Sequence, residues 1–223
     1  MKQLTFDQRP RKDGKARKRP GRKPSARRGV PHTRRPKHAR WEPLHITLRA
    51  VHGLPSFRQQ VIYLAFLEAF RATRRVDFRI VEFSVQSNHV HLVVEADSND
   101  ALACGMKSFT IRANRLFNAA SGRRRGKVWS GRYHRTDLKT PRQVRNALVY
   151  CLGNGRKHGE ISSSSSSKLV IDAASSAPWF TGWSIPRTVR EGPRPTETAR
   201  TFLLGRLWQK HGLIHPSEAP QRA

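Results

Sequence analysis

The sequence contains few cysteines and no long apolar segment. Its 223 residues include only two cysteines, Cys104 and Cys151, which cannot build a disulfide framework and do not stand in a metal-binding Cys pair. The longest uninterrupted apolar run covers the seven residues 61–67, whereas a helix that spans a bilayer needs roughly 20. The charged start is not followed by the apolar segment of a secretory signal. We therefore expect a soluble intracellular protein.

Acidic residues are also scarce. The chain has 15 Asp and Glu against 44 Lys and Arg, which gives a formal net charge of +29. Such a surplus repels itself unless the usual partner is a polyanion, and nucleic acid is the first candidate. An acidic protein or a membrane surface matches this composition less well. The charge predicts a cytoplasmic, nucleoid-associated protein.

The positive charge is concentrated at the start of the chain. Residues 1–40 hold 16 Lys and Arg, two Asp and five prolines, with almost no bulky apolar side chains. Such a segment cannot bury enough apolar surface to offset its ordering entropy. The predicted organisation is a disordered basic tail over 1–40, a folded domain over 41–160, a serine-rich linker over 161–167, and a C-terminal extension over 168–223 with one helix, Thr198–His211.

Apolar periodicity predicts an α+β domain between residues 41 and 160. Alternation indicates strands, and apolar residues at steps of three and four indicate helices, the first of them with Ser56 as its N-cap. The predicted elements are a strand over 45–51, a helix over 57–73, strands over 76–84 and 89–95, a helix over 99–118, a strand over 127–138, and a helix from Pro141 to about residue 154. The first six follow the order of a ferredoxin-like split βαβ fold, an antiparallel sheet with helices on one face and the other face free.

Two histidines stand two residues apart in the third predicted strand. Side chains at this spacing project from one face of a strand, so His89 and His91 lie side by side if Val90 and Leu92 pack under the helices. Two neighbouring imidazoles are suitable ligands for a divalent ion. The alternative is a pair of ordinary surface histidines, because this short motif arises easily by chance.

A tyrosine and an asparagine stand four residues apart on the last helix of this domain. Tyr150 and Asn154 therefore lie on the same helical face, where they form a possible nucleophile and an additional metal ligand. The alternative is a core aromatic residue followed by an asparagine cap, since Asn154-Gly155 also looks like a helix end.

Taken together, these residues resemble the HUH single-strand DNA transposases with one catalytic tyrosine, especially the REP-associated branch. The resemblance covers about residues 41–158 and includes a ferredoxin-like fold. Where the family often continues with Asn-Pro, this chain has Asn154-Gly155. The matching segments are Asn88-His89-Val90-His91-Leu92, the Met106-Lys107 helix ending in Phe117-Asn118, Val128-Trp129 through Arg132-Tyr133, and Tyr150 with Asn154.

The resemblance implies metal-dependent nicking and rejoining of single-stranded DNA through a 5′-phosphotyrosine. It implies His89 and His91 as metal ligands, Asn154 as a polar side chain that helps to hold the ion, and Tyr150 as the nucleophile. It further implies action on hairpin-forming DNA ends by a homodimer. The ion is Mg²⁺ or Mn²⁺, and Mn²⁺ is the better physical match because imidazole is a softer ligand than Mg²⁺ prefers.

Two other tyrosines compete with Tyr150 for the role of nucleophile. Tyr133 stands beside His134 in the fourth predicted strand and is the stronger rival, whereas Tyr63 lies inside an apolar helix and is expected in the core. Any of these phenols needs help at neutral pH, because a free tyrosine has a pKa near 10.

Basic residues of the second helix and the following loop are expected to contact the DNA backbone. Trp129 either stacks on a base or packs within its strand. The expected backbone contacts are Lys107, Arg112, Arg115, Arg123, Arg124 and Arg125.

A catalytically silent module that binds single-stranded nucleic acid on the same fold is the alternative function. The absence of an aromatic RNA-binding signature on the predicted strands counts against this alternative.

Overall fold

One antiparallel sheet organises the residues that the computed structural model describes, which are 35–157, 171–186 and 192–218. The sheet has four strands in the order β2-β3-β1-β4, and every neighbouring pair is antiparallel. This is the strand order of the split βαβ unit, so the predicted ferredoxin-like α+β class is confirmed. The strands are β1 Leu44–Arg49, β2 Phe78–Val85, β3 His89–Ala96 and β4 His134–Asp137.

Two helices, α1 Gln60–Ala72 and α2 Asn99–Ala120, cover one face of this sheet. Their partners are the alternate apolar residues of the strands, such as Ile46 on β1 and Leu92 on β3, which are fully buried. Because side chains alternate across a strand, the residues between them point to the opposite face. This alternation separates an apolar side, packed under α1 and α2, from a more polar side.

The predicted boundaries of two elements were wrong. Ser56 does not cap α1, because its hydroxyl and carbonyl oxygens accept hydrogen bonds from the amides of Arg58 and Gln59 in a turn that precedes the helix. The predicted strand over 127–138 is interrupted after an isolated bridge between Trp129 and Ala50, and regular pairing resumes only in β4.

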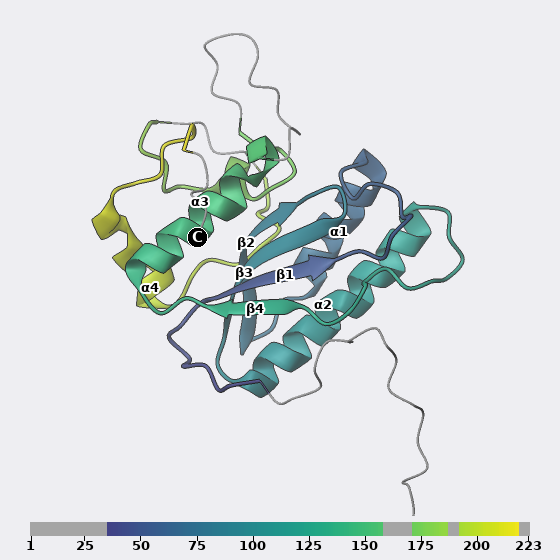
Figure 1. Ribbon diagram of the computed structural model, residues 1–223, viewed down its shortest axis with the longest axis horizontal. Coiled ribbons are helices and arrows are strands. Elements are labelled where there is room, and N and C mark those ends of the chain that lie inside the picture. The colour runs from purple at the N-terminus through teal and green to yellow at the C-terminus, as the bar shows by residue number, and fades with distance from the viewer. Residues whose placement is uncertain (1–34, 158–170, 187–191, 219–223) are drawn as a thin grey trace, which may run out of the picture. The chain divides into compact units, whose positions relative to one another are not determined.

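The third helix, α3 Pro141–Lys157, packs on the sheet face opposite α1 and α2 (Figure 1). Its start is the one predicted: the Thr140 hydroxyl accepts from the Gln143 amide, and the Gln143 side chain accepts from the Thr140 amide. The apolar side of α3 meets Val81 and Val93 of the sheet. The face that the six-element unit leaves open is therefore partly covered by α3.

The C-terminal segment packs on α3 and does not form the single helix predicted over Thr198–His211. The structure has two short helices there, α4 Phe202–Gly205 and the 3-10 helix η3 Leu207–His211, separated at Arg206, whose φ is −140°. A further 3-10 helix, η2 Ala177–Trp179, precedes them. The tryptophans of this region, Trp179 and Trp208, are buried as expected of packing residues.

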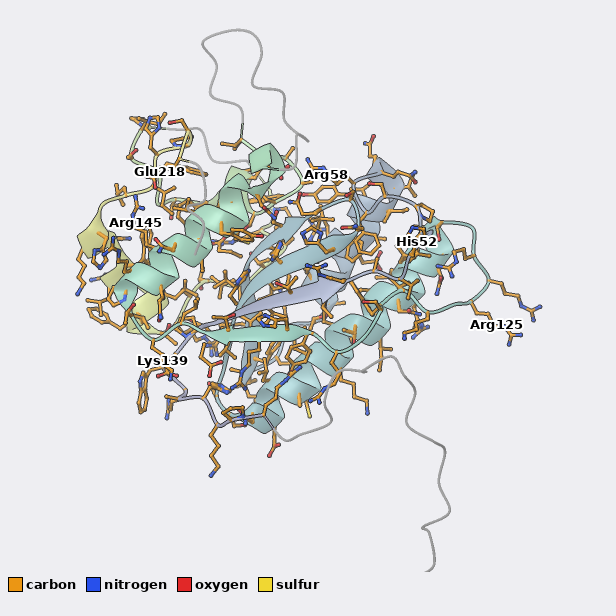
Figure 2. All side chains as sticks on the ribbon, in the orientation of Figure 1. His52, Arg58, Arg125, Lys139, Arg145 and Glu218 are labelled. Atoms are coloured by element: carbon orange, nitrogen blue, oxygen red, sulfur yellow. The ribbon has the colours of Figure 1, made fainter. Side chains whose placement is uncertain are left out.

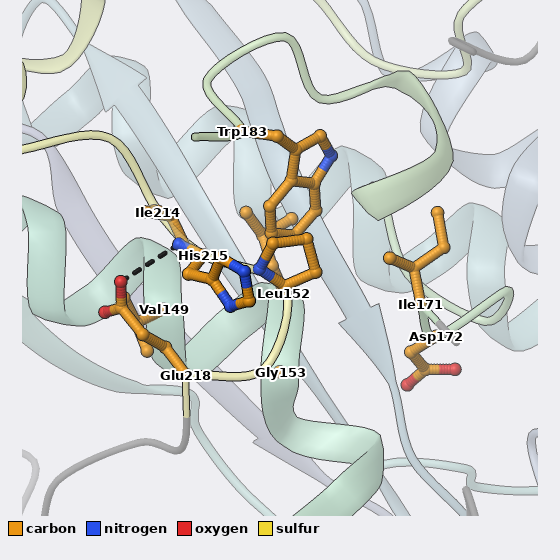
Figure 3. A pocket seen from close by; sticks show the side chains of 10 residues that line it. Val149, Leu152, Gly153, Ile171, Asp172, Trp183, Ile214, His215 and Glu218 are labelled. Carbon is orange, nitrogen blue, oxygen red and sulfur yellow. Dashed lines mark hydrogen bonds between the residues drawn. The ribbon is translucent and has the colours of Figure 1, made fainter. Parts of the chain in front are cut away.

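Ion pairs join this segment to the domain. The Arg58 guanidinium holds the Asp172 carboxylate with two hydrogen bonds of 2.8 and 3.0 Å, and Arg145 on α3 pairs with Glu218 at 2.7 Å (Figure 2). A small pocket lies in the seam between α3 and the segment, lined by Val149, Trp183 and their neighbours (Figure 3). Its cavity of about 10 Å³ is the size of a single water. A ligand larger than water therefore has no room in this seam.

Glu95 near the end of β3 explains why the observed helix begins at Phe202, later than the start predicted at Thr198. Its buried carboxylate accepts hydrogen bonds from the backbone amides of Arg200 and Thr201 and from the Thr201 hydroxyl, and it pairs with Arg79 at 3.0 Å. These bonds hold Thr201 in an extended conformation, with ψ near 140°, so helical geometry begins only after it.

Replacing Glu95 with alanine is expected to lower the free energy of unfolding by about 3 kcal/mol, because the substitution leaves a buried guanidinium without its partner. Guanidinium chloride denaturation of the parent and the Glu95→Ala variant measures this loss. Asp77→Ala is the matched control, since Asp77 forms only an exposed pair with Arg75 and such pairs contribute little. Equal midpoints for Glu95→Ala and the parent would contradict the role given to this carboxylate.

Part of the predicted basic tail is attached to the domain. The Arg35 guanidinium lies 3.6 Å from the centroid of the Tyr133 ring, and His38 bonds to the Asn99 side chain at 2.7 Å. We therefore propose that the folded part begins at residue 35. The rest of the predicted tail, 1–34, and the predicted linker, 161–167, lie outside the described residues. Within the described residues, no helix is both long enough and apolar enough to span a membrane.

Candidate active site

His89 and His91 lie together on the sheet face that carries α3. They alternate along β3 with Val90 and Leu92, which are buried under α1 and α2. The centroids of the two imidazole rings are 4.7 Å apart and the rings are nearly perpendicular, at 89°. Two rings at this separation can share one ion at a metal–nitrogen distance of about 2.1 Å. The side-by-side placement expected from the sequence is therefore observed.

The neighbouring strand β1 adds two side chains to this face. Thr47 is the register partner of His91, and its hydroxyl lies 3.1 Å from Nδ1 of that imidazole. The His45 ring stacks on the His91 ring, with a centroid separation of 5.2 Å and an interplanar angle of 22°. Neither His45 nor Thr47 was predicted from the sequence as part of the site. Their alternation with Leu44, Ile46 and Leu48 was the available signal.

A hydrogen bond at Nδ1 fixes the tautomer of His89, and one at Nδ1 of His91 is compatible with the same tautomer. The Asn88 side-chain oxygen lies 2.8 Å from Nδ1 of His89, and because an amide oxygen only accepts, this Nδ1 donates. In a neutral ring the lone pair then lies on Nε2. The Thr47 hydroxyl allows the same tautomer for His91. A ligating histidine is commonly oriented in this way by a bond to its other nitrogen.

Tyr150 of α3 faces the histidines from the helix side. Its ring centroid lies 4.9 Å from that of His91 and 5.7 Å from that of His45, with edge-to-face geometry in both cases. Burial raises the pKa of the Tyr150 phenol, the nearby Cys151 raises it further, and the positive charge of Arg49 acts in the opposite direction. The protein by itself therefore keeps this phenol protonated at neutral pH.

His45 is a neutral part of the cluster. Burial lowers its pKa to about 4, and the charge of His134 on the adjacent strand β4 lowers it in the same direction. At neutral pH the ring beside His91 is therefore uncharged. The His45 ring stacks on the His91 imidazole without adding a positive charge to the site.

The two rival tyrosines lie elsewhere. Tyr133 packs against the core on the side of α1 and α2, beneath the Arg35 guanidinium. Tyr63 of α1 also packs against that core and donates its hydroxyl to the carbonyl oxygen of Ala173 at 2.8 Å. The chain has three tyrosines, and Tyr150 is the one that contacts the imidazoles.

Asn154 is buried inside α3 and is not its cap, because the helix continues to Lys157. The residue is 0% exposed, and neither atom of its side-chain amide has a hydrogen-bond partner among the described residues. A buried amide without hydrogen bonds costs free energy of folding, because its polar atoms have lost their contacts with water. Of the two amide atoms, the oxygen, which lies one helical turn from Tyr150, is the one that can bind a divalent cation.

The donor set is small. The described residues contain no group of three or more His, Cys, Asp and Glu side chains that could hold a metal. A metal site built on His89 and His91 would therefore need a further ligand of another kind, such as the amide oxygen of Asn154. Nitrogen and oxygen donors in this combination suit Mn²⁺ better than Mg²⁺.

The expected DNA-contacting residues separate into three groups. The five arginines at 112, 115 and 123–125 line one groove on the outer side of α1 and α2. Lys107 is exposed on α2 and is not among the residues that line this groove. Trp129 does not fit the base-stacking role, because it is only 7% exposed, contacts Phe57 and Phe66, and donates its indole N–H to the Thr110 carbonyl.

Comparison with known proteins gives a family model and a solved structure that are similar to parts of this chain. Residues 45–146 match the family model described as "Transposase IS200 like", a range that contains both histidines of the site and ends before Tyr150. A solved structure of a REP-associated tyrosine transposase bound to a REP hairpin is similar over 59% of this chain and 76% of its own, with 18% identity and a TM-score of 0.45. No curated protein matches the chain significantly. Residues 45–146 are therefore similar to the IS200-like transposase family, and the predicted resemblance to the single-tyrosine HUH transposases is confirmed.

Proposed function

We propose that the protein nicks and rejoins single-stranded DNA by transferring one strand end to Tyr150 in a metal-dependent reaction. The observation that supports this best is the position of the Tyr150 ring, 4.9 Å from the ring of His91. A phenol beside two imidazoles that present Nε2 lone pairs combines a nucleophile with a metal-binding pair. The homodimer and the hairpin substrate implied by the resemblance remain predictions.

His89, His91 and Asn154 would hold Mg²⁺ or Mn²⁺. The unsatisfied amide of Asn154 and the Nδ1 hydrogen bonds of both histidines support this assignment. Such an ion, when bound, neutralises charge on the scissile phosphate and on the phenolate. Since burial raises the pKa of Tyr150, the chain alone does not activate its nucleophile.

Tyr150 is proposed to attack the scissile phosphorus. The phenol loses its proton, a bond forms between its oxygen and phosphorus, and the bond from phosphorus to the 3′ oxygen breaks. The departing oxygen takes up a proton, which leaves a free 3′-hydroxyl and a 5′-phosphotyrosine. Because one phosphodiester bond replaces another, the reverse attack by a second 3′-hydroxyl can rejoin the strand.

Arg49 is proposed to steady the phosphate that Tyr150 attacks. It is the register partner of His89 across β1 and β3, and its side chain is exposed. Residues that are paired across two strands project from the same face of the sheet, so Arg49 lies on the face of the histidines, and its positive charge lowers the pKa of the Tyr150 phenol against the larger effect of burial. A guanidinium binds phosphate oxygens through paired N–H donors.

The test is a covalent adduct. Incubation with Mn²⁺ and a labelled single-stranded hairpin oligonucleotide is expected to give a protein–DNA species that survives denaturing gel electrophoresis. Chelation of the metal with EDTA before mixing is expected to prevent it. Tight binding without any adduct, over a range of oligonucleotides, would contradict the proposal and favour the silent binding module.

A further inference from the structure

A basic groove lies on the helix side of the domain, away from the histidines. It has a volume of about 640 Å³ and is lined by the end of α1, the second half of α2 and the loop at residues 123–126. The α1 and α2 layer covers the sheet face opposite His91 and Tyr150. A volume of this size is typical of sites that take a small ligand or one unit of a polymer.

The groove is strongly positive. Five arginines line it, and the acidic residue among its lining is Glu68 of α1. Figure 2 shows Arg125 extending from the loop at the edge of the structure that lies opposite Lys139. A concave surface with this balance of charge concentrates anions, and guanidinium groups bind phosphate with good geometry.

The loop that closes the groove is held in place by two asparagines of α2. The side-chain amides of Asn114 and Asn118 both donate to the Gly126 carbonyl, at 3.1 and 2.9 Å, and the Asn114 oxygen accepts from the Val128 amide. Gly126 has a φ of +153°, and a Cβ atom there would lie 2.3 Å from an Arg123 nitrogen. The Arg123 side chain therefore rests directly on this glycine.

Two buried polar atoms of the groove wall lack partners among the described residues. Asn118 is 5% exposed and its side-chain oxygen accepts no hydrogen bond, while Nη1 of Arg123 is buried and donates none. The bond from the Asn118 nitrogen to Gly126 fixes which end of the amide is the oxygen. A ligand that satisfies both atoms must offer an acceptor to Arg123 and a donor to Asn118.

We propose that this groove binds one nucleotide of the single-stranded DNA, other than the one that is cut. A phosphate offers acceptors only and satisfies Arg123 alone, whereas the exocyclic amine of a base supplies the donor that Asn118 requires. The inference rests on the proposed function for the identity of the strand. The groove then sets which phosphate reaches Tyr150 on the other face.

The test measures equilibrium binding without chemistry. A fluorescent single-stranded oligonucleotide is titrated in EDTA against the Tyr150→Phe protein and against the same protein with Arg115→Ala or Arg123→Ala. Each arginine variant is expected to bind roughly tenfold more weakly and to reduce the salt slope by about one. Lys139→Ala is the control, because it removes an equal charge from an exposed site and should leave both values unchanged.

A scan of abasic positions in the oligonucleotide tests the base contact. One position is expected to lower affinity roughly tenfold, the effect of one buried hydrogen bond, and this sensitivity should vanish in Asn118→Ala. Thermal melting verifies that Asn118→Ala folds, since Asn114 still holds the loop. Arginine variants that bind like Lys139→Ala, or an abasic effect that survives Asn118→Ala, would overturn the groove assignment. Adduct formation by the parent in that case would leave the proposed function intact.

Discussion

Replacing Tyr150 with phenylalanine is expected to abolish the covalent protein–DNA adduct while leaving the affinity for uncut DNA unchanged. The substitution removes one oxygen atom from a ring that packs against His91 and His45, so the site keeps its shape and loses its nucleophile. Removal of a covalent nucleophile commonly costs several orders of magnitude in rate. Denaturing gels measure the adduct, and fluorescence anisotropy in EDTA measures the affinity.

The other two tyrosines provide matched controls for this result. Tyr133→Phe and Tyr63→Phe remove the same atom from rings that pack on the side of α1 and α2. Both variants are expected to form the adduct at the rate of the parent. An adduct that persists in Tyr150→Phe and disappears in Tyr133→Phe would show that the nucleophile is Tyr133, which directly precedes β4, and not Tyr150 on α3.

Replacing His89 or His91 with alanine is expected to lower the affinity for Mn²⁺ by more than about a hundredfold, since even the loss of a group that only orients a ligand costs 10- to 100-fold. Adduct formation should fall in parallel. Isothermal titration with Mn²⁺ measures the affinity in the absence of DNA, so this result does not depend on activity. His52→Ala is the control, because His52 is an exposed histidine in the turn after β1 (Figure 2).

Two substitutions of Asn154 are expected to change the affinity for Mn²⁺ to different degrees. Asn154→Asp keeps an oxygen ligand and should retain Mn²⁺ binding, whereas Asn154→Leu removes the oxygen and should weaken it by about tenfold. Equal Mn²⁺ affinity in the parent, His89→Ala and His91→Ala would contradict the metal site. Unchanged affinity in Asn154→Leu alone would restrict the ligand set to the two imidazoles.

Alternation along the strands predicted most of the sheet and its polar face. His89 and His91 could be placed together because the spacing of side chains along a strand is a local property. His45 and Thr47 could not, since their contacts with His91 depend on the register between β1 and β3. That register is set by turns and packing at long range, which a single sequence does not reveal.

Three other differences between the sequence predictions and the structure have similar causes. Trp129 has an aromatic side chain of the kind that stacks on bases. It is buried against Phe57, Phe66 and Phe109, which come from distant segments, so its burial could not be predicted from its own position in the sequence. The Asn154-Gly155 pair resembles a helix end, yet α3 continues through it. The C-terminal helix was predicted too long because Glu95, more than a hundred residues earlier, binds the backbone where the helix would have begun.

The central claim is that Tyr150 carries the DNA strand end. Its most direct test is mass spectrometry of the adduct after digestion with nuclease and trypsin. Cleavage after Arg145 and Arg156 releases a peptide that contains Tyr150 and neither of the other tyrosines. We expect a nucleotide mass on this peptide through a phosphate ester. The same mass on a peptide with Tyr133 or Tyr63, and an unmodified Tyr150 peptide, would contradict it.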